Sequence, residues 1–224
     1  MIKAKTHNPR FVVLSGGVGG AKLVTGFSEV LPPEEFTILA NTGDDFRHLG
    51  LHISPDLDTL MYTLAGLANP DTGWGLRDES WNFMDSLGRL QGEDWFRLGD
   101  KDLATHLERT RMLSEGLSLD AVTEKLCAAL NVQQRIVPMS NDTVATVLQT
   151  DQGQLAFQDY FVRLQAKPAV RSIEYTGGNT ASPTPAALEA LQNTTLEGII
   201  LTPSNPFLSV APILSIPAIK DAIA

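Results

Sequence analysis

The sequence contains a single cysteine, Cys127, among its 224 residues. One cysteine cannot form an intrachain disulfide or a thiolate metal cluster, and the apolar helical pattern around it favours a role as core filler. Long apolar runs are also missing, and the first ten residues are polar and do not resemble a signal peptide. We therefore expect a soluble, cytoplasmic protein without a membrane-spanning segment.

Positive charge is scarce, since 17 Lys and Arg face 26 Asp and Glu and leave a net charge of −9. This balance argues against a nucleic-acid polymer or an anionic membrane as the partner, because both attract basic surfaces. A small anion remains compatible if a helix N-terminus, a few cations or a metal holds it. With 43% apolar residues, the chain has enough material for one large α/β domain over residues 1–224.

The stretch FVVLSGGVGGAKL, from Phe11 to Leu23, is typical of a strand, a glycine loop and the start of a helix. Glycines leave backbone N–H groups open to a ligand, and the helix N-terminus that follows favours an anion. The loop fits neither common template: a dinucleotide fingerprint requires glycine at Lys22, and a P-loop requires Gly-Lys-Ser/Thr at residues 21–23. A tight turn that binds nothing is the alternative.

A second buried strand is predicted at Phe36 to Ala40, which completes a right-handed β-α-β unit. The acidic segment after it carries Asp44, Asp45, Asp56 and Asp58 and leads into a helix expected at residues 60–68. Carboxylates at strand ends bind Mg²⁺ together with substrate phosphates, or accept a proton from a hydroxyl nucleophile. For Asp56 and Asp58, helix capping is the alternative, and Asp58 lies beyond the best capping position.

Three helices are expected in the middle of the chain, at residues 78–90, 100–114 and 118–130, and we predict that they form a lobe at about 74–130 over the ligand face. The segment Trp95 to Asp102 combines aromatic rings with two cations and a glycine turn, which suits a flat heteroaromatic ligand, although ordinary packing explains such rings as well. His106 is either an interior polar residue or a ligand contact.

Further strands are predicted at residues 135–138 and 196–201, and a β-hairpin at 144–150 and 154–162. The loop Thr202 to Phe207 follows the last strand and contains Asn205 before a proline, so it offers a second helix N-terminus for an anion. The predicted fold is α/β and Rossmann-like, with a mainly parallel sheet, helices on both faces, a helical inserted lobe and a β-hairpin. Polar loops after three strands should meet at one edge of the sheet.

Seven motifs in this order resemble the 2-phospho-L-lactate transferase family: SGGVGGAKL, NTGDD, SPDLDT, WFRLGDKDLATH, VPMSNDTV, FQDYFV and TPSNP. The resemblance covers nearly the whole chain. It implies a role in coenzyme F-420 biosynthesis, in which the ribityl hydroxyl of the deazaflavin 7,8-didemethyl-8-hydroxy-5-deazariboflavin (Fo) attacks a guanosine-diphospho-activated lactate or phosphoenolpyruvate. GMP is released, and Mg²⁺ is required.

The resemblance also implies roles for individual residues. Asp58 and Arg97 match the positions that contact the deazaflavin, and Asp58 is our candidate catalytic base. The other deazaflavin contacts are expected at Asn41, Asp45 and His106. The phosphates and the nucleotide are expected at Gly16, Gly17, Gly19, Lys22, Ser204 and Asn205, and Mg²⁺ at Asp44 and Asp58.

The chain departs from the family pattern in two ways. Asn141 stands where members often have aspartate, and family members usually continue beyond position 224 with a further strand and a polar loop, so we expect a chain that is short for the family. A homodimer is expected from the resemblance alone. The alternative is a nucleotide-sugar-binding regulator of the gluconeogenesis-factor group, which shares the fold; the pair of motifs SPDLDT and WFRLGD favours the transferase.

Overall fold

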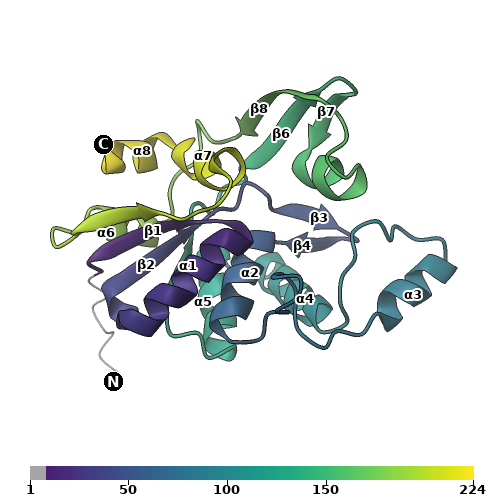
Figure 1. Ribbon diagram of the computed structural model, residues 1–224, viewed down its shortest axis with the longest axis horizontal. Helices are drawn as coiled ribbons and strands as arrows, with labels where there is room; N and C mark the ends of the chain where they lie inside the picture. The colour runs from purple at the N-terminus through teal and green to yellow at the C-terminus, as the bar shows by residue number, and fades with distance from the viewer. Residues whose placement is uncertain (1–8) are drawn as a thin grey trace.

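Four parallel strands form the centre of the structure, a computed structural model that describes residues 9–224 (Figure 1). They are β1 (Phe11–Ser15), β2 (Phe36–Ala40), β5 (Arg135–Pro138) and β9 (Gly198–Leu201), and they lie in the order β5-β2-β1-β9. Val13 of β1 lies opposite Ile38 on one side and Ile200 on the other. The polar opening segment, whose lack of a signal-peptide pattern we noted, lies almost wholly outside the described residues.

Side chains that alternate along the strands build one apolar core on each face of this sheet. Val13 and Ile38 pack against α1 (Gly17–Val30), α2 (Pro55–Leu64) and α5 (Leu119–Ala129). Leu14 and Leu39 pack against helices from the last quarter of the chain. These are α6 (Pro185–Leu191), α7 (Ala211–Leu214) and α8 (Pro217–Ile223). The prediction of a mainly parallel sheet with helices on both faces is confirmed.

The acidic segment after β2 contains two short strands that the sequence did not indicate, β3 (Phe46–His48) and β4 (Leu51–Ile53), which form an antiparallel pair. Helix α2 then begins at Pro55, five residues before the expected start. Proline fits the first helical position because it has no N–H to leave unpaired. As a result, Asp56 and Asp58 lie inside the first turn of the helix rather than in a loop before it.

Of the helices in the middle of the chain, some pack in the core and one extends away from the main body. Helix α5 packs under the sheet, whereas α3 (Asn82–Arg89) extends away from the main body (Figure 1). Between them, α4 (Asp102–Ser114) contacts both β4 and α5. Asp100 caps α3 from outside the helix, because its carboxylate accepts hydrogen bonds from the backbone N–H groups of Asn82 and Phe83 at 3.1 and 3.0 Å.

A second, antiparallel sheet contains the predicted hairpin in shortened form. Strand β6 (Ala145–Thr150) pairs with β7 (Gly153–Ala156) and also with β8 (Val170–Thr176), which the sequence did not indicate. The predicted second strand at residues 154–162 is wrong beyond Ala156, since a π-helical turn, η2 (Asp159–Arg163), follows. Phe157 and Phe161 lie on one side of either a strand or a helix, so the apolar pattern alone did not distinguish the two.

Within residues 9–224, no single helix is both long and apolar enough to cross a membrane. The segments Pro206–Leu214 and Pro217–Ile223 satisfy length and composition only as a pair, and they are bent by 93° at the break between them.

Candidate active site

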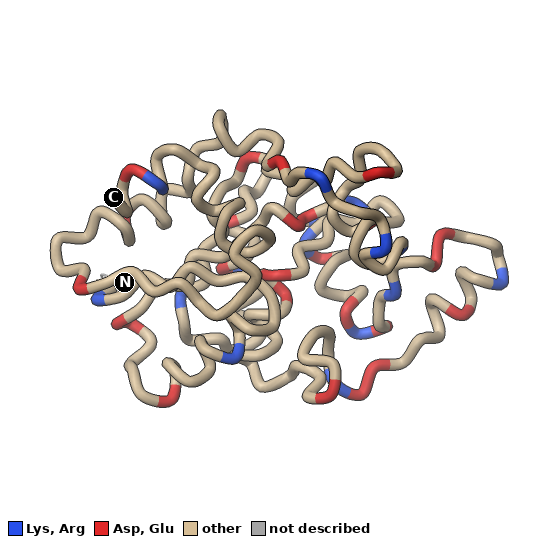
Figure 2. Tube along the Cα trace, turned by 45° about the horizontal axis from the view of Figure 1, so that its top comes forward, with Lys and Arg blue, Asp and Glu red and all other residues tan. Residues whose placement is uncertain are grey.

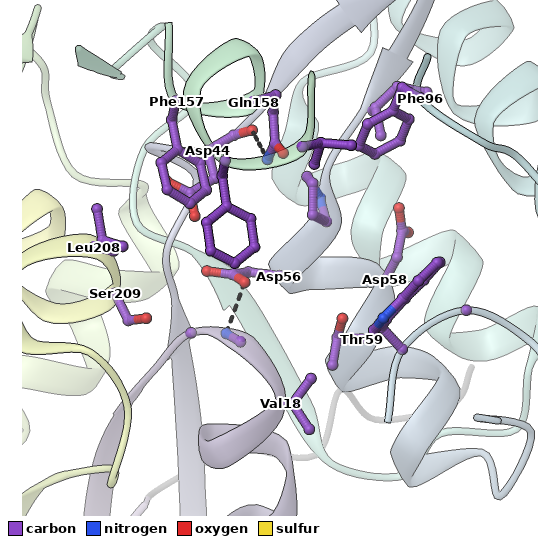
Figure 3. Close-up of a pocket in the computed structure, with 18 of the residues that line it drawn as sticks. Val18, Asp44, Asp56, Asp58, Thr59, Phe96, Phe157, Gln158, Leu208 and Ser209 are labelled. Carbon is purple, nitrogen blue, oxygen red and sulfur yellow. Dashed lines mark hydrogen bonds between the residues drawn. The ribbon is translucent and has the colours of Figure 1, made fainter. Parts of the chain in front are cut away.

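A cavity of about 650 Å³ opens where the loops after β1, β2 and β9 meet (Figure 3). Gly16, Gly17 and Gly19 line it from the junction of β1 with α1, Asp44 from the loop after β2, and Ser204 from the loop after β9. The first and last of these loops touch: a Cβ placed on Gly19 would lie 2.3 Å from the carbonyl oxygen of Pro203. The carboxyl ends of neighbouring parallel strands thus meet at this cavity, which is the candidate site.

Asp56 occupies the N-terminus of α1, where the glycine loop was expected to attract an anion. Its carboxylate accepts a hydrogen bond from the N–H of Gly17 at 2.7 Å and one from Asn41 Nδ2 at 2.8 Å (Figure 3). Gly16 is the N-cap residue of α1 and has no side chain that could cap the helix. Asp56 is therefore a cap, but for α1 rather than for its own helix, and it fixes the glycine loop against α2.

Asp44 and Asp56 form a buried acidic pair in the wall of the cavity. Burial raises the pKa of Asp56 to about 6, although hydrogen bonds from Asn41 and Gly17 oppose the rise. Burial also raises the pKa of Asp44 well above its usual range, and the neighbouring charge of Asp56 adds to the effect. Asp44 Oδ1 is buried without a hydrogen-bond partner. Two such carboxylates are oxygen donors that could hold a divalent cation.

Asp58 is held by a buried arginine that the sequence did not single out. Arg109 on α4 is 0% exposed, and its two terminal nitrogens contact the two carboxylate oxygens of Asp58, one of them at 3.1 Å. His106 lies beside this pair, with Nδ1 3.6 Å from Asp58 and Nε2 3.2 Å from Asp102. Tyr62 donates a hydrogen bond to Asp102 at 2.6 Å. All of these residues except Arg109 line the cavity.

Burial by itself would raise the pKa of Asp102, but the contacts from His106 and Tyr62 outweigh it and lower that pKa. Asp102 thus remains a charged acceptor in the lining of the cavity.

Aromatic rings from two different parts of the chain line the rest of the cavity. Trp95 and Phe96 come from the segment before α4, with ring centroids 5.8 Å apart. Phe157 and Phe161 come from the turn after β7 and stack at 5.4 Å. Arg163 spans the two groups, because its guanidinium lies 5.6 Å from the centre of the Trp95 ring. Such walls suit a planar ligand.

Nine of the twelve predicted site residues line this cavity: Gly16, Gly17, Gly19, Asp44, Asp58, Arg97, His106, Ser204 and Asn205. The other three lie elsewhere. Asn41 is buried behind Asp56, Asp45 accepts hydrogen bonds from Ser54 and His52, and Lys22 is exposed on α1. Arg97 lies 4.3 Å from the centre of the Trp81 ring.

Sequence reasoning missed Arg109 because an arginine in a charged helix is most often solvated. Its spacing of three from His106 was the one available signal, since residues i and i+3 share a helix face.

Among the described residues, no group of three or more His, Cys, Asp or Glu could hold a metal alone. Figure 2 shows acidic positions in the middle of the molecule as well as on its outer loops.

A parallel sheet whose strand-end loops enclose carboxylates and aromatic rings is a typical place for a small-molecule site. The chain belongs to the 2-phospho-L-lactate transferase CofD family, whose model matches residues 11–224. It is therefore a member of a transferase family.

Relatives whose names state an activity are similar to this chain over most of its length. A phosphoenolpyruvate transferase of Streptomyces griseus is 44% identical over 96% of this chain and 69% of its own length. A 2-phospho-L-lactate transferase of Methanopyrus kandleri is 38% identical over 96% of this chain and 69% of its own length. The chain thus spans about two thirds of the length of these relatives.

The fold also resembles a crystal structure of a protein of the UPF0052 family from Bacillus halodurans, with a TM-score of 0.64 and 18% identity. The match covers 96% of this chain and 65% of that one. At this identity the likeness concerns the fold alone.

Proposed function

We propose that this protein transfers a phospho-lactyl or phosphoenolpyruvyl group from a guanosine-diphospho-activated acid to the ribityl hydroxyl of the deazaflavin Fo. A new P–O bond forms to the hydroxyl oxygen, the P–O bond to GMP breaks, and the hydroxyl proton passes to a carboxylate. The observation that carries the proposal is one cavity lined both by polar residues, Gly16, Gly17, Asp44, Asp56 and Ser204, and by four aromatic rings, Trp95, Phe96, Phe157 and Phe161.

Residues in different parts of the cavity have different roles in the proposed reaction. Phosphoryl transfer is catalysed mainly by orienting the two reactants and by neutralising the charge on the transferred group. The aromatic walls hold the planar rings of the acceptor. Asp58 lines the same cavity and is the proposed acceptor for the proton of the attacking hydroxyl. Ser204 and Asn205 hold the nucleotide side of the donor, next to the N-terminus of α1.

A divalent cation fits the acidic pair better than the pair expected from the sequence. Asp44 and Asp56 are buried neighbours, Asp44 has an unpartnered oxygen, and the hydrogen bonds to Asp56 come from the uncharged amides of Gly17 and Asn41. The charge of Asp58, in contrast, is already balanced by Arg109. We therefore propose Asp44 and Asp56 as the protein ligands, with substrate phosphates supplying further oxygens. When bound, Mg²⁺ neutralises negative charge on the phosphates.

The proposed function is tested by titrating the protein with Fo and following deazaflavin fluorescence, and then by adding a guanosine-diphospho-activated acid and Mg²⁺ and measuring GMP release. We expect saturable binding of Fo and formation of GMP only when both substrates are present. Binding of a UDP-sugar without a response to Fo would instead identify a regulator of the gluconeogenesis-factor group.

Mg²⁺ is expected to raise the melting temperature of the protein, because a cation relieves the repulsion between the buried carboxylates of Asp44 and Asp56. In Asp56→Asn this response should be lost, since one negative charge and one metal ligand are gone. The matched control is Asp221→Asn on α8, which replaces an exposed carboxylate and should keep the full response. Differential scanning calorimetry with and without Mg²⁺ makes the comparison; an equal shift in Asp56→Asn would contradict this metal site.

A further inference from the structure

We propose that Arg109 is a positioning residue for the reaction, which holds the Asp58 carboxylate at the cavity wall and fixes the ring of His106 beside it. The inference rests on the proposed function, in which Asp58 contacts the attacking hydroxyl. It concerns a completely buried side chain that is not part of the lining of this cavity, so its effect must pass through its neighbours.

Arg109 makes a bidentate contact with the carboxylate of Asp58. Nη1 and Nη2 of Arg109 each contact a different oxygen of the carboxylate, which fixes both the place and the rotation of the carboxylate plane. Arg109 is completely buried, so water cannot replace it as a partner of Asp58. A lysine at this position would carry the same charge but would present it at a single point.

The same guanidinium orients His106. Arg109 Nη1 lies 3.3 Å from His106 Nδ1, and an arginine nitrogen can only donate, so Nδ1 is the acceptor. The ring proton is then on Nε2, which faces Asp102 at 3.2 Å. Asp102 in turn accepts a hydrogen bond from Tyr62. One buried cation thus sets the orientation of two groups that line the cavity, Asp58 and His106.

The experiment compares turnover per folded molecule in Arg109→Lys with the wild type. Loss of the bidentate contact with Asp58 should lower kcat by about tenfold or more, while the dissociation constant of Fo stays within about threefold of the wild-type value. Arg111→Lys is the matched control, because Arg111 lies on the same helix but is exposed and paired with Glu108 and Glu115. If Arg109→Lys lowers only the melting temperature and keeps the wild-type kcat, Arg109 is merely structural and the proposal fails.

A double-variant cycle tests whether Arg109 acts through Asp58. Arg109→Met alone leaves a buried carboxylate without a partner and is expected to fold poorly, whereas Asp58→Asn/Arg109→Met removes both charges. If Arg109 acts through Asp58, the double variant should have the kcat of Asp58→Asn within about twofold. A further tenfold loss in the double variant would mean that Arg109 acts by another route and would overturn the proposal.

Nitrogen-15 NMR of the histidine rings tests the positioning without any substrate, so it remains decisive if the protein proves not to act on Fo. The chain has four histidines, and His106→Gln assigns the signal of His106. In the wild type we expect His106 with its proton on Nε2, and in the double variant a mixture of both tautomers. A proton on Nδ1 in the wild type would overturn the proposal, whereas absence of turnover with the expected tautomer would overturn only the proposed function.

Discussion

Asp58→Asn is expected to lower kcat by on the order of 10² or more, with Fo binding weakened by no more than about tenfold. The substitution keeps the size of the side chain but removes the charge that accepts the proton. It also leaves Arg109 buried without its partner, so we expect the variant to lose about 3–5 kcal/mol of stability. Turnover and urea denaturation of the same preparation measure the two effects separately.

The control for this experiment is Asp221→Asn, which makes the same chemical change on an exposed part of α8 and should alter neither quantity. A role of Asp58 in helix capping predicts a different result, since asparagine caps nearly as well as aspartate and stability should hardly change. An Asp58→Asn protein with the kcat of the wild type would end the assignment of Asp58 as the proton acceptor.

Gly19→Ala is expected to disrupt the site by separating two strand-end loops. Its new Cβ would lie 2.3 Å from the carbonyl oxygen of Pro203, and both the helix and the loop would have to move because the contact is with backbone. We expect a stability loss of about 1–3 kcal/mol. Turnover should fall on the order of 10²-fold, because the loop that carries Ser204 is displaced from the glycine loop.

Gly26→Ala is the matched control, because Gly26 lies in the same helix and a Cβ there would meet nothing within 4 Å. Alanine in an exposed helix interior should stabilise the protein by about 0.5–1 kcal/mol without changing turnover. Chemical denaturation with an activity assay distinguishes the pair of variants. Equal stability of Gly19→Ala and Gly26→Ala would show that the contact with Pro203 does not constrain the two loops.

The sheet could be predicted from the sequence because its information is local. Short apolar runs such as Phe36 to Ala40, and the glycines after Phe11 to Ser15, specify strand and turn within a few residues. Strand β8 and the turn η2 could not be predicted in the same way. Strand β8 is mostly exposed and alternates only over its second half, and η2 buries none of its residues, so neither has a clear apolar pattern.

The sequence predicted most of the residues that line the candidate site, but not which of them contact one another. Strand ends indicate where polar residues gather, and nine predicted residues do line the cavity. The sequence has no signal that joins Asp56 to Gly17 across 39 positions, or Asp58 to Arg109 across 51. Such pairs depend on how the helices pack against each other. The structure was therefore needed to show that the acidic neighbour of Asp44 is Asp56, whereas the sequence had suggested Asp44 and Asp58 as the metal ligands.

The pairing of β1 with β9 has a consequence for folding kinetics. Phe11 lies opposite Gly198, and Arg10 forms an ion pair with Glu197 at 2.7 Å, so the first and last strands of the sheet meet across almost the whole chain. Contacts of such long sequence separation form slowly, because a large loop must close before they contribute. The wall of the cavity that contains Ser204 and Ser209 follows β9 and is completed only after that closure. During refolding, helical structure should therefore return before the ability to bind a nucleotide.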